Sequence, residues 1–161
     1  MENMNELIAA IETMDPEAIA SAIVMFTGLF AIFAVIALIR YLMTAIGYSK
    51  MYRKAGEAGW KAFIPVYNTY NNYKISWNSK IFFLYAALLI ASSIRVFNEG
   101  ALALIGAAYS IAIIYMAVKQ NINMAKLFGK GAGTGIALIL FPGITSLILG
   151  LGKAEYKAIA E

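Results

Sequence analysis

The chain of 161 residues contains no cysteine and no histidine. Without cysteine there can be no disulfide, thiol nucleophile or thiolate metal site. Without histidine the chain lacks the commonest general base and the usual ligands of zinc and haem. Catalysis would need serine with lysine, or carboxylates alone. We therefore predict that the protein is not an enzyme and has no catalytic residue, metal site or cofactor.

Charge is also scarce. Only 14% of the residues are charged and 61% are hydrophobic, whereas a soluble domain carries about 25% charged residues. The net charge of +4 is small and scattered, which excludes the dense basic surface of a nucleic-acid-binding protein. The composition is typical of an integral membrane protein.

Four apolar stretches predict an all-α protein with four transmembrane helices, since about 20 apolar residues cross a bilayer. We expect residues 16–161 to form one domain behind a short acidic amphipathic segment at 1–15. Pro142-Gly143 should kink the last stretch. A re-entrant hairpin is the alternative for that stretch. The predicted spans are 19–39, 81–98, 101–118 and 131–152.

Local signals support the ends of these spans. Asp15, Pro16 and Glu17 suit, in that order, the N-cap, the first helical position and the acidic first turn of a helix. Arg95 lies near the end of the second span. It can extend to the headgroups and pair with Glu99 four residues on, although a charge in a span is by default a functional candidate.

The basic residues predict the orientation, because short basic loops stay in the cytoplasm. Lysines and arginines gather between the first and second spans and between the third and fourth. The N-terminus should therefore lie outside. A full fourth span would place residues 153–161 outside too, whereas a re-entrant segment would return them to the cytoplasm.

The connection between the first two spans carries an unusual aromatic pattern. Side chains repeat at helical spacing over about 57–77, with lysines and asparagines opposite, which predicts an amphipathic helix at the headgroup boundary. Pro65 should break or bend it, and Gly56 and Gly59 mark its entry turn. The helix either ties two spans to the membrane surface, or it docks a partner or lines a polar cleft, with the amides of residues 68, 71 and 72 contributing. The candidate interface residues are Trp60, Phe63, Pro65, Tyr67, Asn68 and Tyr70.

Two motifs resemble those of a known family. The run KAGEAGWKAFIPVYNTY resembles the KAG-x-x-GW-x-A-x-IP-x-YN-x-Y signature of an uncharacterised family of small bacterial multi-span membrane proteins. AKLFGK, followed by a Gly-rich turn and an apolar run ending LGLG, is similar to its second block. In some bacteria a similar domain is joined to a signal peptidase I. The resemblance implies a bacterial cytoplasmic membrane location and proximity to secretion, without an activity.

The glycine-rich run FGKGAGTG at 128–135 resembles a phosphate-binding loop only weakly. A P-loop requires Gly-Lys-Ser/Thr after a strand, and apolar helices flank this run. We expect Gly129 to end the third helix and the following residues to form a turn. The alternative is a lipid-phosphate site made by Lys126, Lys130 and Gly131 at the start of the fourth helix.

Together these patterns predict a membrane scaffold or accessory subunit that binds a membrane-protein partner or lipid through its cytoplasmic aromatic helix. Homo-oligomers are an alternative, since small residues four apart let helices approach closely. A small oligomeric channel or transporter is the alternative function. A channel would need a polar cavity lined by residues such as Asn68, Ser92, Ser93, Tyr109 or Ser110.

Overall fold

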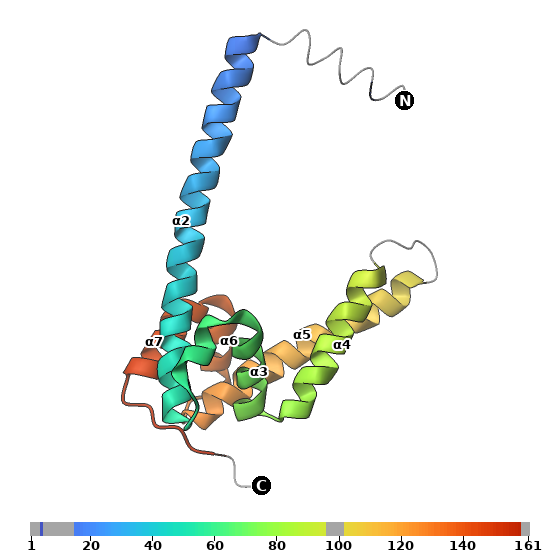
Figure 1. Ribbon diagram of the computed structural model, residues 1–161. Coiled ribbons are helices and arrows are strands. Elements are labelled where there is room, and N and C mark those ends of the chain that lie inside the picture. The colour runs from blue at the N-terminus through green and yellow to red at the C-terminus, as the bar shows by residue number, and fades with distance from the viewer. Residues whose placement is uncertain (1–3, 5–14, 96–101, 159–161) are drawn as a thin grey trace. The chain divides into compact units, whose positions relative to one another are not determined.

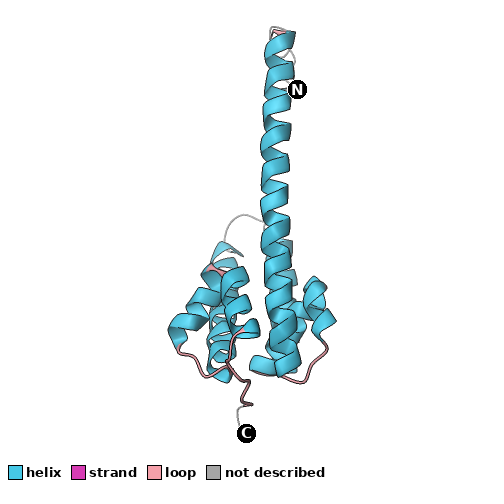
Figure 2. Cartoon of the chain, turned by 90° about the vertical axis from the view of Figure 1, so that its left-hand side faces the viewer, coloured by secondary structure: helices cyan, strands magenta, loops and turns pink. Residues whose placement is uncertain are grey.

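The computed structural model describes residues 4, 15–95 and 102–158. All the elements in these ranges are helices (Figure 2). The described chain divides into two compact units, 1–39 and 40–161. The expected amphipathic segment at 1–15 falls almost entirely outside the described residues, and so does the predicted turn around residues 98–100.

The first unit contains the N-terminal part of helix α2, which runs from Pro16 to Lys54. The predicted cap is confirmed: the Asp15 carboxylate accepts a hydrogen bond of 3.1 Å from the backbone N–H of Glu17. Nearly all side chains up to Ile39 are exposed, including Phe30 at 76%. Among the described residues, α2 is the one helix long and apolar enough to cross a membrane.

The second unit contains residues 40–54 of α2 and the remaining helices (Figure 1). The helix does not stop where the uncharged run ends at Arg40, because no proline interrupts residues 41–54. The other elements are η1 (Gly59–Phe63), α3 (Pro65–Ser76), α4 (Ser79–Arg95), α5 (Leu102–Leu127), α6 (Ala132–Leu140) and α7 (Pro142–Leu151).

The hydrophobic core of the second unit joins the C-terminal ends of α2 and α5 to α6 and α7. Tyr52 and Met51 from α2 are fully buried against Met124 from α5, with Leu138 of α6 and Leu149 of α7 completing the cluster. Complete burial of one methionine or leucine side chain stabilises the folded state by about 1.5–3 kcal/mol. The core therefore holds together segments that lie about 100 residues apart in the sequence.

The prediction that Pro65 divides the aromatic segment is confirmed. The segment is not one helix over 57–77, because Ile64 has extended backbone angles (φ −110°, ψ 115°) between η1 and α3. Pro65 then takes the first helical position of α3, where its missing N–H costs nothing. The predicted entry turn is present at Gly56, which has a positive φ of 78° that glycine adopts without strain.

Helices α4 and α5 pack against each other, and α5 continues to Leu127, beyond the span predicted to end at 118. The apolar part of α4 and the whole of α7 are shorter than a membrane-spanning helix requires. Four complete spans are therefore not found in the described residues. The side chain of Arg95, and with it the expected pair to Glu99, lies outside the described residues.

The predicted fourth span is two short helices rather than one. Phe141 leaves helical geometry between them (φ −131°, ψ 59°), where Pro142 cannot supply an N–H. Helix α6 turns back along α5, so that Gly135 lies against Ile122. The chain then returns to the end of α5, where the Lys157 N–H donates to the Leu127 carbonyl at 2.7 Å. Residues 131–152 form a hairpin whose two ends lie together.

Helix α7 lies in close contact with the C-terminal part of α2. A Cβ atom added to Gly47 would lie 2.2 Å from the Ser146 hydroxyl, and one added to Gly150 would lie 2.5 Å from the Gly47 carbonyl. The ammonium of Lys54 donates to the carbonyls of Leu149, Gly152 and Ala154 at 2.9, 2.7 and 2.8 Å. One of these bonds satisfies the Leu149 carbonyl, which the end of α7 leaves without a partner inside the helix, and the other two hold carbonyls just beyond that end.

We predict that Gly47→Ala destabilises the second unit by about 1–3 kcal/mol or more, because the new methyl group would overlap the backbone of α7. The same substitution at Gly28, on the same helix, meets open space and should be neutral or slightly stabilising. Thermal unfolding of the two variants in detergent micelles gives the comparison. Equal melting temperatures for the two variants would contradict the close α2–α7 contact.

Candidate functional site

Five large apolar side chains from η1, the linker and the first turn of α3 are exposed together. Trp60 is 54% exposed, Val66 68% and Tyr67 49%. The rings of Trp60 and Tyr67 meet edge to face at 5.5 Å between centroids. The Tyr41 hydroxyl of α2 donates to the Phe63 carbonyl and so fixes η1. We call this patch the aromatic surface: Trp60, Phe63, Ile64, Val66 and Tyr67.

The other predicted interface residues serve the packing of α3. The hydroxyl of Tyr52 lies within hydrogen-bond distance of the Asn68 side chain and of Asn72 Oδ1, the latter at 2.9 Å. The ring of Tyr70 packs on Phe82 of α4 at 5.3 Å. Helical spacing placed the asparagines opposite the aromatic face, but it did not separate Tyr70, which faces α4, from the exposed Trp60 and Tyr67.

Asn71 does not supply a surface amide either. The side chain is fully buried, and neither of its amide atoms has a hydrogen-bond partner in the structure. A buried polar group in this state costs about 1–3 kcal/mol. The three asparagines of α3 therefore do not line a common polar cleft in the described residues.

An apolar groove of about 370 Å³ lies between α3 and α4. The α4 residues that line the groove recur every three or four positions, which is the spacing of one helical face, and the small residue Ala86 lies at their centre. Pro65 and Val66 line its α3 side, so the groove continues directly from the aromatic surface. The lining residues are Pro65, Val66, Thr69, Phe82, Tyr85, Ala86, Leu89 and Ile90.

The carboxylate of Glu57 makes ionic contacts that hold the aromatic segment in place. Glu57 accepts hydrogen bonds from Lys61 of η1 at 2.6 Å and from Lys74 of α3 at 2.5 Å. These hydrogen bonds, of which the one from Lys61 has the larger effect, lower the pKa of Glu57 below its ordinary value of 4.5. This pair of ionic contacts holds η1 and α3 to the turn that leaves α2.

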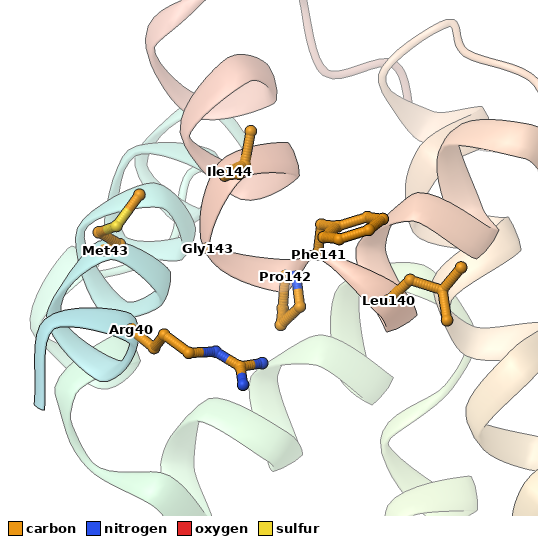
Figure 3. A pocket seen from close by; sticks show the side chains of 7 residues that line it. All are labelled: Arg40, Met43, Leu140, Phe141, Pro142, Gly143 and Ile144. Carbon is orange, nitrogen blue, oxygen red and sulfur yellow. The ribbon is translucent and has the colours of Figure 1, made fainter. Parts of the chain in front are cut away.

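A second pocket, of about 320 Å³, lies where α2 meets the break between α6 and α7 (Figure 3). Arg40 extends along one side of it toward Pro142, and Phe141 and Leu140 stand on the other side. Apart from Arg40, its walls are apolar or glycine. In the sequence, Arg40 is the residue that directly follows the uncharged run 19–39.

The prediction that Gly129 ends the third helix is confirmed, but the turn is shorter than expected, because residues 132–135 of the glycine-rich run already belong to α6. Gly129 has a positive φ of 67°, and the Lys130 N–H donates to the Ala125 carbonyl at 2.9 Å, as expected for a glycine that ends a helix. The three proposed phosphate ligands are exposed: Lys126, Lys130 and Gly131. Gly131 caps α6 without a side-chain hydrogen bond.

Together, these features define an all-helical protein with one long apolar helix and an exposed aromatic surface. The chain belongs to the family of unknown function DUF5684, which matches residues 60–158. The match begins at the first residue of the aromatic surface and covers η1 and α3 to α7. No curated protein and no solved structure matches the chain.

The contacts of Glu57 predict a pH dependence of stability. The pKa of Glu57 is lower in the folded protein than its ordinary value of 4.5. The ionised carboxylate therefore contributes its full stabilisation above pH 4.5, and this stabilisation is lost as the pH falls through the pKa of the folded protein. The melting temperature should fall in that acidic range. Glu57→Gln should lower stability at pH 7, by about 1 kcal/mol or less per ion pair, and flatten the acidic decrease. The control is Glu155→Gln at an exposed position; an unchanged acidic decrease in Glu57→Gln would contradict the assignment.

Proposed function

We propose that this protein is a non-enzymatic scaffold or accessory subunit of the bacterial cytoplasmic membrane that binds a second membrane protein. The observation that carries the proposal is the continuity of the aromatic surface with the groove between α3 and α4. Exposed Trp and Tyr side chains are suited to the headgroup boundary. An apolar groove leading away from such a surface suits a transmembrane helix that crosses the same boundary.

The shape of the groove supports a helix as its occupant. The α4 wall offers Phe82, Ala86 and Ile90 at four-residue spacing, the pattern by which helices pack side by side. The small side chain of Ala86 lets a partner backbone approach closely, as small residues do between membrane helices. An acyl chain is the other apolar occupant, and the experiment below distinguishes the two.

Three of the polar residues named for a channel are engaged locally, which disfavours the transport alternative. Ser92 donates to the Leu89 carbonyl at 2.8 Å, and Ser110 donates to the Gly106 carbonyl at 3.0 Å. Asn68 is held by Tyr52. These groups bond to their own helix or to the neighbouring one. A bundle that conducts polar solutes would instead present them to a shared cavity.

For the topology, we propose three spans, over residues 19–39, 81–98 and 101–118, followed by a hairpin at the cytoplasmic face. Three spans with the N-terminus outside return the chain to the cytoplasm after α5. The joined ends of the 131–152 hairpin keep the C-terminal tail on that side. The link to secretion rests on the family resemblance alone.

Cysteine labelling tests this topology, since the chain has no cysteine of its own. Single-cysteine variants Glu17→Cys, Lys61→Cys and Lys157→Cys are treated with a membrane-impermeant maleimide in spheroplasts and in inverted vesicles. We expect residue 17 to react from outside and residues 61 and 157 from the cytoplasmic side. Labelling of residue 157 from outside would instead indicate a fourth complete span.

Photo-crosslinking tests the partner site. A photoreactive amino acid at Ile90 in the groove should yield one discrete adduct of the size of a second protein. Filling the groove with Ala86→Leu should abolish that adduct, because the added side chain occupies the position of the partner helix. Replacing Trp60 and Tyr67 with Ala should weaken it while leaving membrane insertion intact.

The matched control is Ala87→Leu, which makes the same change on the neighbouring, exposed position of α4. This variant should keep the adduct. A protein adduct that survives Ala86→Leu as well as Ala87→Leu would show that the groove is not its site. Adducts to phospholipid alone would show that the groove holds acyl chains, and the scaffold proposal would fail.

A further inference from the structure

We propose that the pocket beside Arg40 is a binding site for an anionic phospholipid, with the lipid phosphate on the Arg40 guanidinium and an acyl chain against the tip of the α6–α7 hairpin. This site is separate from the groove between α3 and α4. It also differs from the glycine-rich turn at 128–135, which the sequence singled out for phosphate.

The pocket has the two-part chemistry of an amphiphile site. Its volume is about 320 Å³, and one cationic side chain stands against walls formed by Met43, Leu140, Phe141 and Ile144 (Figure 3). A guanidinium presents donors in a planar fork that suits two phosphate oxygens at once. The other side chains that line the pocket are apolar, so there is no second charged side chain to hold a small soluble anion.

Arg40 is available for such a ligand. In the part of the chain that the structure describes, both ion pairs belong to Glu57, so Arg40 makes none. It follows directly on the uncharged residues 19–39 of the same helix. A helix that enters the hydrocarbon with those residues places Arg40 at the depth of the lipid phosphates.

The hairpin tip provides the apolar half of the site. Leu140 is 62% exposed, Phe141 60% and Ile144 55%, all within a few residues of the break at Pro142. In water such a cluster would remain without apolar contacts, whereas beside Arg40 it can contact the acyl chain of the lipid bound there. Charge at one end and apolar surface at the other therefore favour a lipid over free phosphate.

Native mass spectrometry of the purified full chain in mild detergent tests the site. The protein is titrated separately with dioleoylphosphatidylglycerol, with dioleoylphosphatidylcholine and with glycerol 3-phosphate. We expect retention of one phosphatidylglycerol in preference to the other two probes. Arg40→Gln should weaken that retention by about tenfold, the effect of losing one charged hydrogen-bonding contact. Arg40→Lys should weaken it less.

The matched control is Arg53→Gln, the same substitution at an exposed position of the same helix outside the pocket. It should retain the lipid as the unmodified protein does. Leu140→Ser should weaken retention of both lipids, since it removes part of the apolar wall. Equal retention by Arg40→Gln and Arg53→Gln would overturn the proposal. So would glycerol 3-phosphate binding as well as phosphatidylglycerol, because the site would then be one for a soluble anion.

Discussion

The second unit depends on the contact between α2 and α7. Lysine has three N–H donors, and Lys54 directs all three to carbonyls at and just after the end of α7. The absence of a side chain at Gly47 and at Gly150 lets the two helices come close enough for this to happen. Because α7 is anchored there, residues 131–152 return to the end of α5 as a hairpin.

The C-terminal part of α2 contributes to both candidate binding surfaces. The buried cluster around Tyr52 joins the end of α2 to α3 through Asn68 and Asn72, and this leaves Trp60 and Tyr67 facing outward. At the other end of the α2–α7 contact, Arg40 meets the hairpin tip. Both surfaces combine exposed apolar side chains with residues typical of the headgroup boundary. The polar contacts are used inside the unit, to hold its helices together.

Much of this arrangement could be predicted from local signals. The cap at Asp15, the break at Pro65 and the helix end at Gly129 each follow from the backbone preferences of one or two residues. The long apolar helix follows from composition. Long-range contacts could not be predicted, because a lysine at 54 and three carbonyls about 100 residues later leave no joint pattern in one sequence. For the same reason, the choice between a span and a hairpin stayed open at Pro142.

The candidate site was predictable in part. Spacing placed Trp60, Phe63 and Tyr67 on one aromatic face, and all three side chains are exposed in the structure. Tyr70 continues the spacing of that face and Asn68 lies opposite it, but the partners that they meet, Phe82 and Tyr52, come from other helices and leave no local pattern. The pocket beside Arg40 requires the approach of α7 to α2, which only the folded chain provides.

The separation of Lys54 from its acceptors has a consequence for biosynthesis. The three carbonyls lie 95, 98 and 100 residues further along the chain. While the chain is being made, α2 exists long before the residues that cover its Gly47 face. Closure of the unit must therefore wait until residues 149–154 have left the ribosome. Until then the face of α2 around Gly47 stays open, so a chaperone or a neighbouring helix could occupy it first.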